Sequence, residues 1–206
     1  ALGTPAQNMV VADRSGRIAW TIYGSLPRRI GFDGTLPESW ADGWRGWNGF
    51  LTPAEYPRII NPPGGRLWTA NARVADGSIL QTLGDGNYDI GARAREIRDR
   101  LRQREKFSAR DMLDIQLDAR STFLARWRDL ILKHLTTETI AGDAERARFR
   151  EVVEKDWTGE ASPDSAAYRL TRMFRDQVID RVTSFVLAEC YEADPSFDYT
   201  RIRRRE

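Results

Sequence analysis

Residues 7–23 read Gln7-Asn-Met-Val-Val-Ala-Asp-Arg-Ser-Gly-Arg-Ile-Ala-Trp-Thr-Ile-Tyr23. The run 8–12 is mostly apolar, 13–16 has the Asp, Ser and Gly composition of a turn, and 17–23 is rich in β-branched and aromatic side chains. This pattern predicts a β-hairpin with a short loop. Because both runs are apolar on more than one face, we expect the hairpin to lie inside a covered sheet.

The stretch that follows the hairpin is rich in Gly, Pro and Trp. Residues 24–66 predict a long loop without regular elements, and residues 67–71 predict another strand. Three indoles stand close together in the loop, at Trp40, Trp44 and Trp47. They either line a pocket for an aromatic or sugar ligand or hold the loop against the fold.

The composition changes near residue 91. Residues 1–91 hold 14 of the 16 Gly, 7 of the 9 Pro and 5 of the 7 Trp, so we expect strands and ordered loops there and helices in 92–206. Ser108 and Asp111 have the spacing of a capping box. Apolar residues recur at helical spacing from Met112 to Ile131, and a stripe from Leu170 to Val186 follows a Ser-Pro start at 162–163. Further helices are expected over 93–103 and 144–155.

Composition excludes several classes of protein. The formal net charge is +2 and 41% of the residues are hydrophobic, which excludes disorder along the whole chain. No apolar run approaches the roughly 18 residues of a membrane span. A single cysteine, Cys190, excludes an internal disulfide, and a single histidine, His134, excludes a multi-His metal site. The near-balanced charge and the lack of Lys clusters argue against nucleic acid. No nucleotide-binding or HExxH motif is present, so we expect no cofactor and no metal site in these residues.

One ordered set of residues is specific. It comprises Asn8, Asp13, Gly16, Gly24, Pro27, Arg29, Asp33, Pro37, Pro57, Asn61, Gly65 and Asn71, and continues through 93–97, 108–121, Trp157 and 164–166. This order resembles the catalytic β-chain of the penicillin acylase (penicillin amidase) family of N-terminal-nucleophile amidohydrolases. The resemblance implies an α+β fold: a partial αββα N-terminal-nucleophile hydrolase sandwich over 1–91, followed by a helical lobe over 92–206.

The resemblance also implies a mechanism. Such a precursor is cut to expose a Ser, Cys or Thr, whose own α-amine, with a pKa of roughly 7.7–8, acts as the base. The nucleophile attacks an amide carbonyl, and water then releases the acyl-enzyme. Asn8 matches the family's oxyanion-hole asparagine, and Arg29 its active-site arginine, which can order the asparagine and a polar network. The adjacent Arg28 is easily confused with Arg29.

The departures from the family pattern lead to further expectations. Ala1 is not a nucleophile, and only seven residues precede Asn8, so we expect an internal segment of a β-chain that is inactive alone. Its partners would be the remainder of its own precursor, meaning the α-chain and the rest of the β-chain, and an acyl-amide small molecule. The family implies export to the periplasm or beyond, and calcium in some full-length members. Aryl-acetyl, glutaryl and fatty-acyl groups all stay open as substrates.

Two other expectations concern association. The isolated segment is expected to self-associate through residues 8–23 or 67–71, because its strands would lack neighbours; a clean monomer by ultracentrifugation would contradict this. The alternative function is a free-standing helical protein-interaction module, with 92–206 as the folded part and the first 91 residues as a docking arm.

Overall fold

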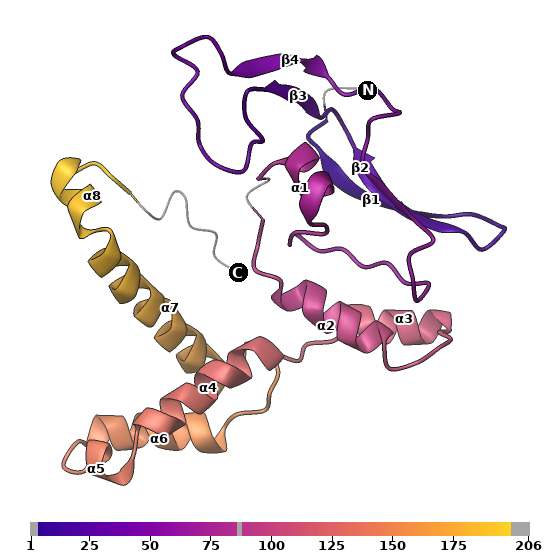
Figure 1. Ribbon diagram of the computed structural model, residues 1–206. Helices are drawn as coiled ribbons and strands as arrows, with labels where there is room; N and C mark the ends of the chain where they lie inside the picture. Colours follow the sequence, from indigo (N-terminus) through magenta and orange to yellow (C-terminus); the bar gives the residue numbers. More distant parts are fainter. Residues whose placement is uncertain (1–3, 86–87, 199–206) are drawn as a thin grey trace. The chain divides into compact units, whose positions relative to one another are not determined.

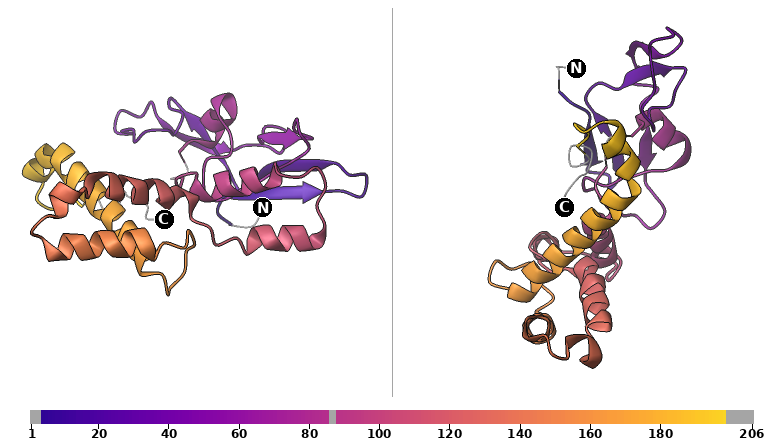
Figure 2. Two further views of the ribbon diagram at one scale, coloured as in Figure 1. Left: turned by 90° about the horizontal axis from the view of Figure 1, so that it is seen from below. Right: turned by 90° about the vertical axis from the view of Figure 1, so that its left-hand side faces the viewer.

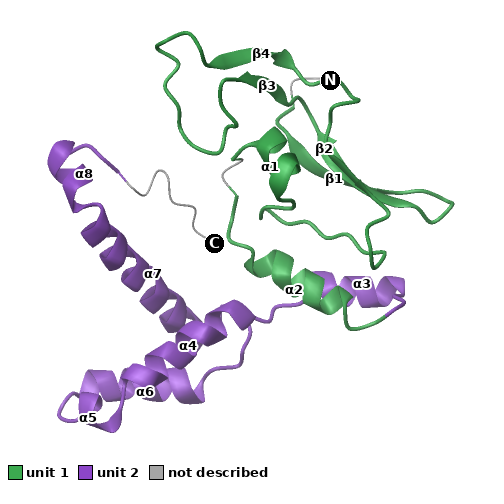
Figure 3. Cartoon of the chain, viewed as in Figure 1, with its two compact units in different colours: residues 1–104, 204–206 green, residues 105–203 purple. Residues whose placement is uncertain are grey.

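The computed structural model describes residues 4–85 and 88–198, which form a mixed α+β fold in two compact units (Figure 1). The first unit runs to Arg104 and the second begins at Glu105 (Figure 3). Strands occur in the first unit, and the second is helical.

A three-stranded antiparallel sheet contains the predicted hairpin. Strands β1 (Gln7–Ala12), β2 (Ile18–Tyr23) and β5 (Arg58–Ile60) are ordered β1-β2-β5. In the turn, Asp13 Oδ1 accepts hydrogen bonds from the Ser15 backbone N–H (2.8 Å) and hydroxyl (2.6 Å). Gly16 has φ +83°, a left-handed conformation that glycine adopts without a Cβ clash. The hairpin prediction is therefore confirmed.

Burial in this sheet differs between the strands. Trp20 on β2 is fully buried, whereas every residue of β1 is exposed. The expectation of a covered hairpin is thus right for the centre of β2 and wrong for β1 within the described residues. Strand β1 is also an edge strand with β2 as its partner, so its outer backbone groups are open. Self-association through this edge stays a prediction.

The long loop holds more regular structure than its composition indicates. Strands β3 (Pro27–Ile30) and β4 (Gly46–Phe50) pair antiparallel, and β5 also lies in this stretch. The strand expected at 67–71 is wrong, since that segment has no strand pairing. The Trp40 ring contacts Phe32 (centroids 5.8 Å apart) and Trp47 of β4 (5.7 Å), which links the loop to β4. All three indoles are nevertheless exposed, Trp44 most of all.

Two helices complete the first unit: α1 (Gly77–Leu83) and α2 (Ala92–Leu101). Helix α2 belongs with the strands, although the composition changes before it. Arg93 donates to the Asn71 side chain (2.9 Å), and the Arg102 guanidinium lies over Trp68, 5.8 Å from the ring centroid. These contacts lie within the first compact unit, which extends to Arg104. The division into a sheet core over 1–91 and a helical lobe over 92–206 stays a prediction.

The second unit contains six helices within the described residues. They are α3 (Ala109–Gln116), α4 (Thr122–His134), α5 (Thr137–Ile140), α6 (Ala144–Lys155), α7 (Ala166–Val186) and α8 (Ala188–Ala193). The Ser108–Asp111 capping box is confirmed, and α6 has its predicted bounds. The helix expected from 112 to 131 is instead interrupted between α3 and α4. Helix α7 is capped by Ser165 rather than Ser162, because Ser165 Oγ accepts from the Tyr168 N–H.

The core of this unit lies between α4, α6 and α7, which contact one another (Figure 2). Ile131, Val153 and Thr171 are almost completely buried there. Arg128 of α4 donates to the carbonyls of Val153 and Glu154 at the end of α6, and Arg150 of α6 donates to those of Leu132 and Leu135 at the end of α4. Each arginine thus satisfies carbonyl groups at the C-terminus of the other helix.

The apolar stripe expected along α7 is buried only in part. Leu170, Phe174 and Val178 are half-buried, while Val182, Phe185 and Val186 are exposed. The packed residues of the first turns are Ala167, Thr171 and Arg175, spaced four apart on one face. Across the described ranges, no helix is long and apolar enough to cross a membrane.

Candidate functional site

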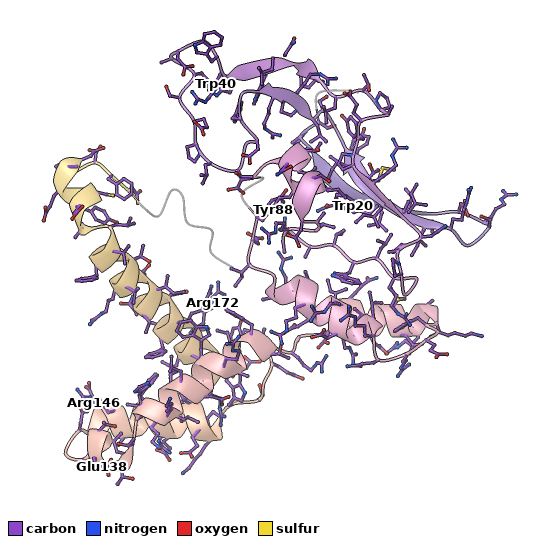
Figure 4. All side chains as sticks on the ribbon, viewed as in Figure 1. Trp20, Trp40, Tyr88, Glu138, Arg146 and Arg172 are labelled. Carbon is purple, nitrogen blue, oxygen red and sulfur yellow. The ribbon has the colours of Figure 1, made fainter. Side chains whose placement is uncertain are left out.

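Asn8 lies near the start of the edge strand β1, and its carboxamide has two partners. Its Oδ1 accepts a hydrogen bond from the indole Nε1–H of Trp20 (2.8 Å), and its Nδ2 donates to the backbone carbonyl of Ala70 (3.3 Å). Trp20 lies in the sheet of the first unit (Figure 4). The two contacts use both ends of the amide, so its orientation is defined.

This arrangement leaves donor capacity at Asn8. A carboxamide nitrogen carries two N–H groups, and the Ala70 carbonyl takes one. Asn8 is an exposed residue, so its second N–H is a candidate donor to a ligand. A neutral donor held in a fixed direction is what stabilisation of an oxyanion requires.

Arg29 lies on β3 and reaches helix α1. Its Nη1 donates to the Thr82 carbonyl and its Nη2 to the Leu83 carbonyl, both at 2.9 Å. A guanidinium there satisfies carbonyls at the negative end of the helix. Arg29 therefore connects the second sheet to the C-terminus of α1.

Two glycines make room for the Arg29 side chain. A Cβ at Gly34 would lie 2.3 Å from Arg29 Nε, and one at Gly84 would lie 2.7 Å from its Nη2. Both glycines have positive φ, +77° and +73°. The nearby Asp33 carboxyl has a lowered pKa, chiefly because the Thr35 hydroxyl and backbone N–H donate to it, with a smaller contribution from Arg29. The backbone around Arg29 is thus shaped to this one side chain.

The two adjacent arginines face different partners. Arg28 forms a two-pronged ion pair with Glu55, with both N–O distances 2.7 Å. Hydrogen bonds from Arg28, followed by those from Thr52, lower the pKa of the Glu55 carboxyl to about 2. Because Arg28 is committed to this exposed pair, Arg29 is the arginine of the two that contacts the helix.

Tyr88 adds a phenol to the Arg29 surroundings that sequence reasoning did not single out. Its hydroxyl donates to the Gly84 carbonyl (3.2 Å). Burial raises the pKa of Tyr88, and the negative charge of Asp85 adds to the shift. The phenol therefore stays protonated and able to donate at neutral pH.

The structure does not join the two predicted site residues directly. Within the described ranges, no hydrogen bond links Asn8 with Arg29; Asn8 is ordered by Trp20 and Ala70 instead. The place of Arg29 in an active-site network stays a prediction, as does the oxyanion role of Asn8. Trp20 was missed because its role appears only with the strand register: Asn8 pairs with Ile22, which puts Trp20 diagonally across on the same face.

The remaining candidates have ordinary surroundings. His134 lies in the last turn of α4, where a cation suits the helix dipole, and Cys190 is exposed. Over residues 4–85 and 88–198, no group of three or more His, Cys, Asp or Glu is arranged to hold a metal ion. Ala1 lies outside the described residues.

Asn8, with both ends of its carboxamide hydrogen-bonded on the edge strand β1, is the candidate site of this α+β fold. Comparison with known proteins gives the family: the penicillin amidase family model matches residues 1–205. The chain belongs to the penicillin amidase family.

Two named relatives are similar to this chain, each at 29% identity. The acyl-homoserine lactone acylase QuiP of Pseudomonas fluorescens Pf-5 is 29% identical over 177 residues, covering 82% of this chain and 22% of that protein. The penicillin acylase 2 proenzyme of Pseudomonas sp. SE83 is 29% identical over 181 residues, covering 86% and 22%. The chain thus spans about a fifth of the length of these relatives.

A solved structure shares the fold. The thermostable penicillin G acylase of Alcaligenes faecalis aligns with a TM-score of 0.59 at 23% identity, covering 90% of this chain and 34% of that one. The mixed arrangement of small sheets and helices is therefore similar to a part of that acylase.

Proposed function

We propose that this chain is part of an N-terminal-nucleophile acylase and supplies its oxyanion-hole donor, Asn8. One observation carries the proposal: the Asn8 carboxamide is held at both ends by Trp20 and Ala70 and keeps one N–H for a ligand. Family membership supports the same reaction class, the hydrolysis of an amide that carries an acyl group. The strands of the first unit would form part of an αββα sandwich, completed by the rest of the protein.

The proposed chemistry divides between this chain and the remainder of its precursor. A Ser, Cys or Thr at a processed N-terminus outside these residues attacks the acyl carbonyl, and its α-amine takes the proton. Charge develops on the carbonyl oxygen, and the free N–H of Asn8 donates to it. Collapse expels the amine, which receives the proton, and water then attacks the acyl-enzyme by the same route.

The substrate class follows from the relatives. Their names specify penicillin and acyl-homoserine lactones, which share an acyl group on an amide nitrogen. We propose a substrate with the same linkage and a protein that is exported, as the family resemblance implies. Any calcium would be bound by the complete enzyme.

Because the proposed nucleophile and its base lie outside these residues, we predict that the 206-residue chain is inactive by itself. The complete protein should hydrolyse acyl amides such as phenylacetyl, glutaryl and long-chain acyl derivatives, and the isolated chain should release no amine above the buffer rate. Product release by mass spectrometry measures both. Turnover by the purified 206-residue chain would show that its own residues suffice and would overturn the proposed division.

A second candidate function is the helical interaction module. It is favoured by the compactness of residues 105–198, which have their own core at Ile131, Val153 and Thr171, and by the exposed apolar end of α7. This reading predicts that the helical part unfolds cooperatively after removal of residues 1–91. A broad, non-cooperative thermal transition of that truncated chain would count against it.

A further inference from the structure

We propose that Trp20 is the positioning residue of this site: its indole N–H sets the direction of the Asn8 carboxamide so that an N–H, and not the oxygen, faces the substrate. The inference rests on the proposed function, because it assumes that Asn8 donates to an oxyanion. It goes beyond that function in assigning the orientation of Asn8 to a particular side chain.

The first step is chemical. An indole N–H can donate a hydrogen bond and cannot accept one. The group 2.8 Å from Trp20 Nε1 must therefore be the Asn8 oxygen, which is the acceptor end of the amide. The opposite end, Nδ2, is directed to the Ala70 carbonyl at 3.3 Å. A rotation of the amide by 180° would lose both hydrogen bonds and bring the Asn8 oxygen against the carbonyl oxygen of Ala70.

The second step concerns rigidity. Trp20 is fully buried at the centre of β2, between β1 and β5, where it pairs with Val10 and Ile59. Asn8, in contrast, lies on an exposed edge strand, where a polar side chain has many rotamers open to it. The buried ring therefore supplies a fixed donor to an otherwise mobile side chain. The shorter of the two Asn8 contacts is the one from Trp20, so most of the restraint is expected from the indole.

The third step links orientation to rate. In the flipped carboxamide, the Asn8 oxygen would face the developing negative charge, and a flipped molecule would not turn over. Loss of the indole donor should thus lower kcat while leaving KM nearly unchanged, because the substrate carbonyl carries little charge before attack. One neutral hydrogen bond predicts a fall of about tenfold, below the roughly 10²–10³-fold expected for losing the Asn8 donor itself.

The experiment uses the complete protein with five variants. Trp20→Phe keeps an aromatic ring and removes the N–H; a benzothienylalanine at position 20, which replaces N–H by sulfur in a bicyclic ring of the same shape, does so without a cavity. Thr21→Val is the matched control. It removes one hydrogen bond, from Thr21 Oγ1 to the Pro57 carbonyl (2.8 Å), on the same strand but the opposite face. Asn8→Ala and the double variant Asn8→Ala/Trp20→Phe complete the set.

The inference predicts a fall of about tenfold in kcat for Trp20→Phe and for the benzothienyl protein, and little change for Thr21→Val. It also predicts that Trp20→Phe adds no further loss in the Asn8→Ala background, since a residue that acts through another loses its effect when the other is gone. A purely structural role would give the same loss in both backgrounds.

Failures of the two proposals are distinguishable. If Asn8→Ala lowers kcat but the benzothienyl protein keeps full turnover, the positioning role of Trp20 is wrong and the proposed function stands. The positioning role is also wrong if Trp20→Phe lowers kcat equally with and without Asn8. If Asn8→Ala keeps full turnover, the oxyanion role fails and the positioning role fails with it.

Discussion

Replacing Asn8 by alanine in the complete protein is expected to lower kcat for acyl-amide hydrolysis by about 10²–10³-fold, with little change in KM. The reason is that the Asn8 N–H would stabilise charge that appears only when the carbonyl is attacked. The variant removes the acceptor of Trp20 as well, so a small loss of stability is expected. A thermal melt beside the kinetics separates the two effects.

Two further variants sharpen this test. Asn8→Asp keeps the size and the acceptor for Trp20 but presents a negative charge to the oxyanion, so its loss should be at least as large as that of Asn8→Ala. Gln7→Ala is the control, because it removes the neighbouring carboxamide on the opposite face of β1. Normal turnover by Asn8→Ala, or an equal loss from Gln7→Ala, would contradict the assignment.

The second large effect is on stability. Val153→Ala is expected to lower the free energy of unfolding by about 2 kcal/mol, because two methyl groups leave a fully buried position and a cavity is left behind. Val182→Ala makes the same chemical change on the exposed end of α7 and should cost less than about 0.5 kcal/mol. Urea unfolding followed by circular dichroism measures both.

Val153→Ala and Val182→Ala together also test whether the C-terminal end of α7 is exposed. The apolar stripe in the sequence predicts burial along the whole helix, whereas the structure leaves Val182, Phe185 and Val186 exposed. Equal destabilisation by Val153→Ala and Val182→Ala would show that the far end of α7 is covered in solution. The expected difference would show that this end of α7 is exposed in the 206-residue chain.

Local patterns predicted much of the fold, and longer-range pairing accounts for what they missed. The hairpin at 7–23 and helix α6 follow from β-branched runs, turn residues and helical periodicity, which are local signals. Strand β5 has three residues, too few for a periodic pattern, and it forms because β2 offers it a partner. Residues 67–71 have strand composition but no strand pairing; the Ala70 carbonyl accepts from the Asn8 side chain.

In the candidate site, too, the local sequence predicts some features and long-range contacts determine the others. Asn8 and Arg29 are predicted as site residues from the order of residues along the chain, which resembles that of a known family. Their hydrogen-bond partners could not be predicted in this way. The contact of Trp20 with Asn8 depends on the strand register, and the contacts of Arg29 depend on where α1 ends, more than fifty residues away.

The most direct test is a crystal structure of the complete processed protein with a boronic acid that forms a tetrahedral adduct on the N-terminal nucleophile. The account predicts that Asn8 Nδ2 lies about 2.7–3.1 Å from an oxygen of the adduct, with the Asn8 oxygen still bound to Trp20. An adduct oxygen beyond hydrogen-bonding distance from Asn8, or one stabilised by other donors alone, would contradict it.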